Sequence, residues 1–313
     1  MGRSPIAPRV FNCAAPDTGN MEILAEFGTP AQKKRWLEPM LAGEMRSCFS
    51  MTEPETAGSD PTLLRTRALR DGDHYVINGH KWFTSGAYGS SFAIAMVVTD
   101  PDAPPHRRAS MIIVPTDTPG FNLIRAVSVM GHTGGGGHCE IRYEDCRVPA
   151  TNMLGVEGGG FAIAQARLGP GRIHHCMRCI GAAERAMELM CTRANTRYTH
   201  GSLLAEKSVI QNWVAESRME IDSARFMVLH AAWKMDNVGK KEARQEIAMI
   251  KVIAANMMMT VLDRAIQTFG AMGVSDDTPI ARMWRDGRSM RLADGTDEVH
   301  KMTIARRELR KWQ

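Results

Sequence analysis

After Cys48, the hydrophobic pattern changes its period at the glycine-rich stretch Gly155–Gly160. Between Cys48 and this stretch, apolar residues fall in short runs that end at Gly or Pro, which indicates β-strands. After it, they recur every three or four positions over long segments, which indicates helices. The sequence therefore predicts an α+β fold with a sheet domain over residues 48–155 and a helical domain over residues 156–313.

The first of these domains is predicted to be an antiparallel β-barrel or sandwich. Its clearest local signal is Asn78-Gly79 between Tyr75–Ile77 and Lys81–Phe83, which predicts a hairpin closed by a two-residue turn. Further strands are predicted over Ser91–Thr99, Ser110–Pro115, Phe121–Ala126 and His138–Tyr143.

The second domain is predicted to be a four-helix bundle. Its helices are expected over Ile173–Tyr198, Ala205–Asp236, Lys241–Phe269 and Glu298–Lys311. Residues 1–47 read as the remnant of a further helical domain, in which Thr29-Pro30 begins a helix that runs to Leu41. Leu168–Arg172 is expected to end one helix and to begin the next. Arg172 would then be directed toward a cleft on the sheet side, and a surface arginine is the alternative.

Composition excludes several classes of protein. The 313 residues are 44% hydrophobic, enough for two packed domains. The net charge of +5 comes from 39 basic and 34 acidic residues without a dense basic block, so it fits anionic small molecules as readily as nucleic acid. We identify no apolar run near the ~20 residues of a membrane span and no leader, and expect an intracellular protein. It would be cytoplasmic in a bacterium and mitochondrial or peroxisomal in a eukaryote.

The seven cysteines have no disulfide or metal-knuckle spacing and read as reduced thiols. Cys176 and Cys179 form a C-x-x-C that follows His174 and His175, which leaves a metal or redox site as an alternative. We favour a structural role, because the segment is helical and no second ligand pair follows.

Two polar turns and one carboxylate are candidates for ligand chemistry. Cys48–Met51 reads as a strand, and Thr56–Ser59 after it offers N–H and hydroxyl donors that suit a phosphate or a polar ring edge, although a plain turn has the same composition. Gly134–Gly137 reads as a loop between strands. Asp294 interrupts the helical pattern; beside an apolar cleft it could act as a base, and on the surface it is only a loop residue.

Four arginines, Arg282, Arg285, Arg288 and Arg291, recur at every third position. Such a row is usually a solvated helix face, and binding of a polyanion is the alternative.

Taken together, the chain resembles the acyl-CoA dehydrogenases over essentially its whole length. Met51–Pro54 with Ala57–Asp60 resembles the first signature of that family, and Asn78–Gly86 resembles the strand that carries its flavin-stacking Trp. Phe11–Asn20 and Ala293–His300 resemble the branch whose animal members follow a kinase-like domain.

The resemblance implies an FAD whose isoalloxazine ring lies between the sheet and the C-terminal bundle. Trp82 would pack on the ring and Thr84 would hydrogen-bond near its N5 atom. Arg197, Gln267 and Gly270 would complete the adenine half in a neighbouring subunit, so a homodimer or homotetramer is expected. The residues assigned to FAD are Phe49, Met51, Thr52, Gly58, Ser59, Trp82, Phe83, Thr84, Arg197, Gln267, Gly270, Thr296 and Glu298.

The resemblance also implies a reaction. Asp294 matches the catalytic Glu of most members and would remove the α-proton of an acyl-CoA thioester. The β-hydride would pass to flavin N5, which gives a trans-2-enoyl-CoA, and electrons would go on to an electron-transfer flavoprotein. Ser59, Arg172 and Gly295 are assigned to the substrate. No metal is needed, and no nucleic-acid partner is expected.

Some residues depart from the family pattern. Asp at the base position is usual in the kinase-linked branch, which is associated with long, branched or 4-hydroxylated chains. Ala293, His200 and Ser208 replace residues that are common at the cofactor site, so weaker FAD binding is expected. The first helices of the family have no counterpart before Met1, and we expect a truncated chain. The alternatives are a non-catalytic flavoprotein or structural homologue, and a nucleic-acid-binding relative that uses the arginine row.

Overall fold

A computed structural model of the chain describes residues 1–133 and 137–313. Most of the predicted loop Gly134–Gly137 thus lies outside the described residues. The chain divides into two compact units, Arg9–Leu168 and Gly169–Gln313 with Met1–Pro8. We call them the sheet unit and the helical unit, and each is described by itself.

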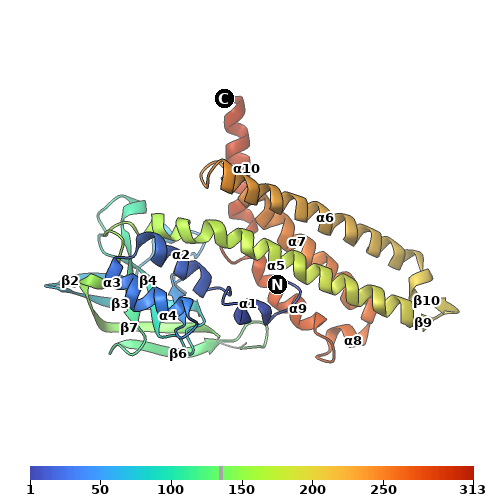
Figure 1. Cartoon of the computed structure of the whole chain (residues 1–313), viewed down its shortest axis with the longest axis horizontal. Coiled ribbons are helices and arrows are strands. Elements are labelled where there is room, and N and C mark those ends of the chain that lie inside the picture. Colours follow the sequence, from blue (N-terminus) through green and yellow to red (C-terminus); the bar gives the residue numbers. More distant parts are fainter. Residues whose placement is uncertain (134–136) are drawn as a thin grey trace. The chain divides into compact units, whose positions relative to one another are not determined.

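The sheet unit contains one eight-stranded sheet in the order β6-β7-β3-β2-β4-β5-β8, with β1 beside β4 (Figure 1). The α+β class is confirmed, but the sheet is mixed rather than wholly antiparallel, because β1 and β2 both pair with β4 in parallel. The strands are β1 (Ser47–Ser50), β2 (Arg67–Asp71), β3 (His74–Ser85), β4 (Phe92–Val98), β5 (Ala109–Pro115), β6 (Phe121–Val127), β7 (His138–Pro149) and β8 (Met153–Leu154).

The central strands β4 and β5 are buried on both faces, which explains their continuous apolar sequence. Ala93 and Ile112 face the core that the sheet closes with β3 and β7. Phe92 and Ile113 face a second core, which is covered by the N-terminal helices (Figure 1). These helices are α2 (Asp17–Phe27), α3 (Pro30–Gln32), the π-helical η1 (Lys33–Leu37) and α4 (Glu38–Leu41).

The predicted hairpin at Asn78-Gly79 is wrong. β3 runs through both residues as one 12-residue strand, and the two-residue turn lies earlier, at Gly72-Asp73 between β2 and β3. Gly79 instead allows the backbone of β3 to pass close to Thr66, because a Cβ at position 79 would lie 2.4 Å from the Thr66 hydroxyl oxygen. A short-range turn signal cannot reveal a contact with Thr66, which is distant in the sequence.

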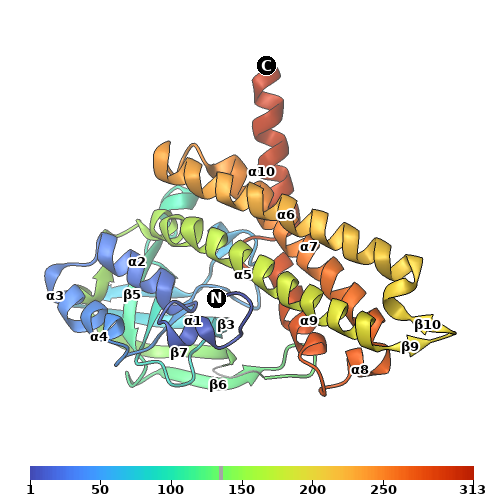
Figure 2. The ribbon, with the colours of Figure 1, turned by 45° about the vertical axis from the view of Figure 1, so that its right-hand side comes forward.

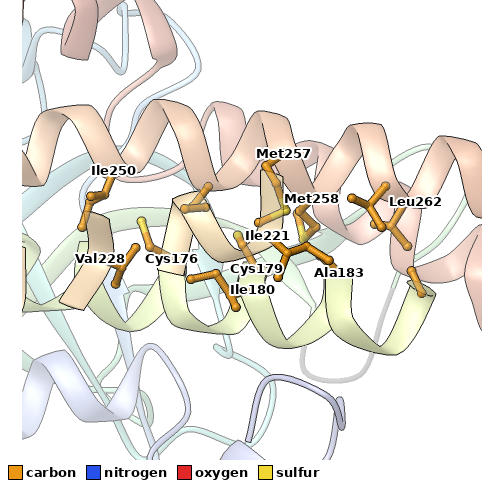
Figure 3. Close-up of a cluster of buried hydrophobic side chains, with 14 of the residues drawn as sticks. Cys176, Cys179, Ile180, Ala183, Ile221, Val228, Ile250, Met257, Met258 and Leu262 are labelled. Carbon is orange, nitrogen blue, oxygen red and sulfur yellow. The ribbon is translucent and has the colours of Figure 1, made fainter. Parts of the chain in front are cut away.

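The helical unit is built on long helices that lie side by side (Figure 2). Predicted helices are confirmed at α6 (Ser208–Asn237), α7 (Arg244–Phe269) and α10 (Asp297–Leu309). Shorter elements are α8 (Ala271–Val274), α9 (Ile280–Arg288), η6 (Ser289–Arg291) and the hairpin β9 (Tyr198–Thr199) with β10 (Ser202–Leu203). Cys176, Cys179, Ile221 and Met258 meet in the bundle core (Figure 3).

Among the described residues, α7 is the one helix long and apolar enough to cross a membrane, which the sequence reading did not anticipate. The most apolar window of this helix is 61% buried inside the structure. Its residues Ile250, Ala254 and Leu262 belong to the bundle core, so its hydropathy is that of a core helix.

The predicted break at Leu168–Arg172 is wrong, because α5 (Gly160–Thr196) is one continuous 37-residue helix (Figure 1). Pro170 lies inside it and removes one backbone donor, yet packing on either side maintains the helix. Ile163 belongs to the core of the sheet unit and Ile173 to the core of the bundle. The two units therefore divide within this helix, at Leu168 and Gly169.

The C-x-x-C cysteines are free thiols in the bundle core, in line with the structural reading. Burial raises the pKa of Cys179 to about 12 and also raises that of Cys176, so both are protonated at neutral pH. Within residues 1–133 and 137–313, no group of three or more His, Cys, Asp or Glu side chains is arranged to hold a metal ion.

Candidate active site

A β-bulge in β3 organises the sheet side of the candidate site. Lys81 pairs with Ile141 of β7 and Thr84 with Cys139, so three steps on β3 oppose two on β7. Phe83 has a positive φ of 50° at this point. The bulge breaks the regular alternation of side chains, because Lys81 and Thr84 are both buried whereas Trp82 and Phe83 both retain exposed surface.

Trp82 and Thr84, which a regular strand would place on one face, are therefore separated. Thr84 is 0% exposed, and its hydroxyl lies 3.3 Å from that of Ser50. Phe83 is 40% exposed, and Ser85 is partly exposed. The Ser85 hydroxyl lies 2.6 Å from Nδ1 of His138, whose ring is 5.4 Å from that of Phe83.

A buried ion pair fixes the polar turn beside the bulge. Lys81 donates to Glu53 at 2.9 Å and to the Met51 carbonyl at 2.8 Å. Glu53 also accepts from the backbone N–H groups of Arg65 and Thr66. Burial lowers the pKa of Lys81 to about 8 against the opposing effect of Glu53. Burial would raise the pKa of Glu53, but the Lys81 charge and the hydrogen bonds lower it overall.

The start of the turn presents mixed apolar and hydroxyl surface. Phe49, Met51 and Thr52 are each partly exposed, and the Thr52 carbonyl accepts from the Trp82 N–H at 3.0 Å. Gly58 and Ser59 are exposed. A Cβ at Gly58 would lie 3.1 Å from the Thr52 methyl group, so the turn is narrow at this point.

Arg167 is buried in the same unit. Its guanidinium lies 4.0 Å from the centre of the Phe49 ring, and its Nε donates to Asn20 at 2.9 Å. This contact fixes the ring of Phe49, with the cation over one of its faces. Sequence reasoning missed Arg167, because Asn20 and Phe49 are far from it along the chain.

A cavity of about 270 Å³ lies in the sheet unit next to the end of β3. Ser85 and Gly86 line it, as do His138 and the ion pair between Asp17 and Arg46. Its wall thus offers hydroxyl, imidazole and guanidinium groups close to the exposed ring of Phe83, a set of groups that suits a polar, anionic ligand.

In the helical unit, Asp294 is held at both its backbone and its carboxylate. It follows η6 and has a positive φ of 57°. Arg172 Nε donates to its carbonyl at 2.9 Å, and Nε2 of His300 lies 3.3 Å from the same oxygen. Its Oδ2 lies 3.1 Å from Nε2 of His175. Arg172 and Asp294 thus lie in contact within the helical unit.

Cationic and imidazole groups surround this carboxylate. Lys251 of α7 is only 2% exposed, donates to the Met290 carbonyl, and has its pKa lowered by burial. Burial also lowers the pKa of Arg172, which the charge of Asp294 opposes. Burial, Arg172 and Lys251 together lower the pKa of His300 to about 4, so this ring is neutral at pH 7. Nε2 of His300 can then donate to the Asp294 carbonyl.

The residues assigned to a neighbouring subunit lie at the C-terminal ends of α5 and α7. Arg197 follows α5, Gln267 lies in the last turn of α7, and Gly270 caps that helix. All three are exposed. The two helix ends meet where the guanidinium of Arg193 lies 5.5 Å from the centre of the Phe269 ring.

The start of α10 carries the other two residues assigned to FAD, together with Gly295. Thr296 is the N-cap of the helix and accepts from the Val299 N–H, and Glu298 is exposed in the first turn. Gly295 has a φ of 102° and lies directly beside His300, because a Cβ there would be 2.8 Å from its Nε2.

The arginine row does not form a solvated helix face. Arg282 is exposed, but the side chain of Arg285 is only 15% exposed. Arg291 is paired with the buried Asp297 at 2.8 Å. The described arginines therefore do not offer a continuous basic surface, which weakens the nucleic-acid alternative.

The side chains of the sheet unit are of the kinds that can bind FAD. Half-exposed Phe49 and Phe83 offer surface for a planar ring, and the hydroxyls of Thr52, Ser59 and Ser85 suit its polar edges. The narrow turn at Gly58 leaves backbone accessible. The donor set fits a flavin nucleotide.

Sequence reasoning found Asp294 and Arg172 but missed the site roles of His175, Lys251 and His300. The signal for Lys251 is that it is the one charge between Ile247 and Leu262 in the apolar pattern of α7, since a lysine there must reach a polar partner. His175 carries no such signal, because its partner is more than a hundred positions away.

Comparison with known families identifies the family of this fold. The acyl-CoA dehydrogenase middle-domain model matches residues 48–146, and the acyl-CoA dehydrogenase C-terminal-domain model matches residues 158–309. The chain belongs to the acyl-CoA dehydrogenase family.

Its relatives confirm the branch that the sequence indicated. The chain is 56% identical over 306 residues to Probable acyl-CoA dehydrogenase FadE2 of Mycobacterium tuberculosis, covering 97% of this chain and 75% of that protein. It is 50% identical to acyl-CoA dehydrogenase family member 11 of Homo sapiens, covering 99% of this chain but only 40% of the human protein. The solved butyryl-CoA dehydrogenase of Megasphaera elsdenii is 31% identical, with a TM-score of 0.85 over 92% of this chain and 74% of that one.

Proposed function

We propose that the protein binds FAD and dehydrogenates an acyl-CoA thioester to a trans-2-enoyl-CoA. The observation that carries this proposal is Asp294, which by resemblance stands at the position of the family's base. Its partly buried carboxylate lies 3.1 Å from His175, and its backbone carbonyl accepts a hydrogen bond from Arg172. Family membership and the half-exposed rings of the sheet unit support the cofactor.

In this proposal Asp294 accepts the α-proton of the substrate. A thioester α-proton is weakly acidic, so the carbonyl must be polarised by hydrogen-bond donors, for which the Asp294 backbone N–H is our candidate. Arg172 and His300 fix the peptide that follows, since both contact the Asp294 carbonyl. Bound FAD would accept the hydride from the β-carbon.

On the sheet side, Phe49, Met51 and Thr52 would contact the flavin ring, and Phe83 with Trp82 would cover it. Ser85 would donate near the ring in place of the buried Thr84. Gly58 and Ser59 would face the pyrophosphate or the thioester, and the cavity beside Ser85 would take a polar part of the ligand. Gly295 and Arg172 remain the proposed substrate contacts of the helical unit.

The adenine half of FAD is proposed to need a second copy of the chain. Arg197, Gln267 and Gly270 are exposed at two helix ends that meet, as a contribution to another subunit requires. We therefore propose a homodimer or homotetramer, in which Thr296 and Glu298 serve the nearer pyrophosphate. An electron-transfer flavoprotein is the proposed electron acceptor.

The test is the visible spectrum of the purified protein during anaerobic addition of a panel of acyl-CoA thioesters. We expect a flavin band that bleaches with the correct substrates and thereby ranks them. In Asp294→Asn, FAD should stay bound while bleaching by acyl-CoA is lost, because only the base is removed. Reduction of Asp294→Asn at the wild-type rate would refute the assignment of the base.

The rival function is that of a non-catalytic flavoprotein. It predicts a flavin band that dithionite bleaches but no acyl-CoA does. Absence of any bound flavin, even after reconstitution with FAD, would contradict both functions.

A further inference from the structure

His175 and Asp294 form a contact that the proposed reaction does not by itself require. Nε2 of His175 lies 3.1 Å from Oδ2 of Asp294, and the two side chains are 16% and 19% exposed. They approach from different elements, since His175 belongs to α5 and Asp294 to the segment before α10. A largely buried contact of this kind is screened less than a surface pair and constrains both side chains.

The other ring nitrogen of His175 indicates which atom carries the proton. Its Nδ1 lies 3.4 Å from a terminal guanidinium nitrogen of Arg178, one turn further along α5. A guanidinium can only donate hydrogen bonds, so Nδ1 must accept. In that arrangement the proton is on Nε2, which donates to the Asp294 carboxylate.

We propose that His175 is a positioning residue for the base Asp294, acting through a hydrogen bond from its Nε2–H to Oδ2. The inference rests on the proposed function of Asp294. An aspartate side chain is one methylene shorter than the glutamate of most family members, so its carboxylate is placed closer to its own backbone. The Asp294 backbone is fixed by Arg172, and His175 then fixes the direction of the carboxylate.

The hydrogen bond also changes the charge balance of the base. Donation to a carboxylate favours its ionised form, which is the form that can accept a proton. The other charged or titratable groups that face Asp294 are Arg172 and Cys176 from α5, Lys251 from α7 and His300 from α10. The two cations act in the same sense as His175, and the buried Cys176 is a neutral thiol.

The first experiment needs no turnover. In the FAD-loaded protein without substrate, side-chain ¹⁵N spectra of the 10 histidines give the tautomer of each ring, and loss of one signal set in His175→Gln assigns His175. We expect the neutral Nε2–H form, with a signal that shifts in Asp294→Asn. A proton on Nδ1, or a His175 signal unaffected by Asp294→Asn, would overturn the proposal.

The second experiment follows the rate of anaerobic flavin reduction against pH. His175→Leu removes the hydrogen-bond donor to Asp294, so a higher pH is needed to ionise the Asp294 carboxylate. The acid limb of the pH–rate profile should therefore move up by about one to two pH units. His175→Gln keeps an N–H donor on a side chain of similar reach and should restore most of the wild-type profile. The matched control is His174→Leu, at the exposed residue that precedes His175. This variant should leave the acid limb of the pH–rate profile unchanged.

The results separate this inference from the proposed function. If Asp294→Asn abolishes reduction and His175→Leu leaves the acid limb unmoved, His175 is not a positioning residue, although Asp294 remains the base. If no acyl-CoA reduces the wild-type flavin, the proposed function fails. The tautomer of His175 and its response to Asp294→Asn then still decide whether the hydrogen bond exists.

Discussion

The backbone conformation at position 294 favours an aspartate, in addition to the proposed role of its carboxylate as a base. Its φ of 57° lies in the left-handed region, where Asp and Asn are several-fold enriched among non-glycine residues. Their short side chains tolerate this conformation by hydrogen bonding locally. The segment from Asp294 to the N-cap Thr296 thus suits an aspartate, and the loss of one methylene relative to Glu need not be read as loss of function.

His300 predicts how stability depends on pH. The pKa of this ring is about 4 in the folded protein, against an ordinary value of 6.5. Between these values the unfolded chain binds a proton that the folded chain does not, so stability is lost as the pH falls from about 6.5 to about 4. His300→Gln removes this proton and should flatten the dependence.

The measurement is the free energy of unfolding from denaturant titrations at several pH values between 4 and 7. For a shift of this size, the difference between the wild type and His300→Gln should change by about 3 kcal/mol at most across the window. A difference that is constant over the window would contradict the assignment. His230→Gln, at an exposed position of α6, is the control.

At the scale of elements, the contact between the polar turn and β3 depends on the pair of Lys81 and Glu53, which are 0% and 2% exposed. Lys81→Met leaves a buried carboxylate without its cation, which costs about 3–5 kcal/mol. The free energy of unfolding of Lys81→Met should fall by that amount. The double variant with Glu53→Gln should recover part of the loss, and a double variant no more stable than Lys81→Met would show that the charge is not the cause.

The bulge in β3 gives a prediction about the cofactor. Phe83 and Trp82 both retain exposed surface, so Phe83→Ala and Trp82→Ala should each weaken FAD retention on gel filtration, the first at least as strongly because its ring is the more exposed. Thr84→Val should retain FAD, because that hydroxyl bonds Ser50. Loss of FAD in Thr84→Val with full retention in Phe83→Ala would show that Thr84, rather than Phe83, contacts the cofactor.

Local patterns predicted the elements well where the pattern was long. The periodicity of α6 and α7 and the short apolar runs of β4 to β6 appear in the structure within a few residues. Turns and helix breaks that were predicted from two or three residues were less reliable. Asn78-Gly79 and Gly169-Pro170-Gly171 read as a turn and a helix break, but strand β3 continues through the first, with a shift in its register, and helix α5 continues through the second.

The candidate site was predictable in part, for the same physical reason. Asp294 and the turn after β1 carry local signals, because each interrupts a periodic segment. The neighbours His175 and Lys251 lie on regular helices and meet Asp294 only through the fold. The bulge at Phe83 depends on the pairing of β3 with β7, which the sequence of one strand does not contain.

For the whole molecule, α6 offers a surface for assembly. Met219, Phe226, Leu229 and Trp233 are 51–71% exposed and recur at helical spacing along one face of this helix. A row of large apolar side chains on a protein surface commonly marks an interface. We expect this face to take part in the proposed homo-oligomer.

The prediction is that Phe226→Glu with Trp233→Glu lowers the oligomer mass measured by light scattering after gel filtration. FAD retention should fall with it, because the adenine half would lose the partner's Arg197. Leu69→Glu, at an exposed apolar residue of β2, is the control that should leave the mass unchanged. An unchanged mass in the double variant would exclude this face as the interface.

The continuity of α5 has a consequence for recombining parts of related enzymes. The loop before Gly160 looks like the natural joint between two modules, yet Ile163, Ala164 and Arg167 just beyond it pack with the sheet and its N-terminal helices. A chimera spliced in that loop would take these side chains from the wrong parent. A graft that preserves both cores must be joined inside the helix, at Gly169-Pro170-Gly171, with the helical phase kept.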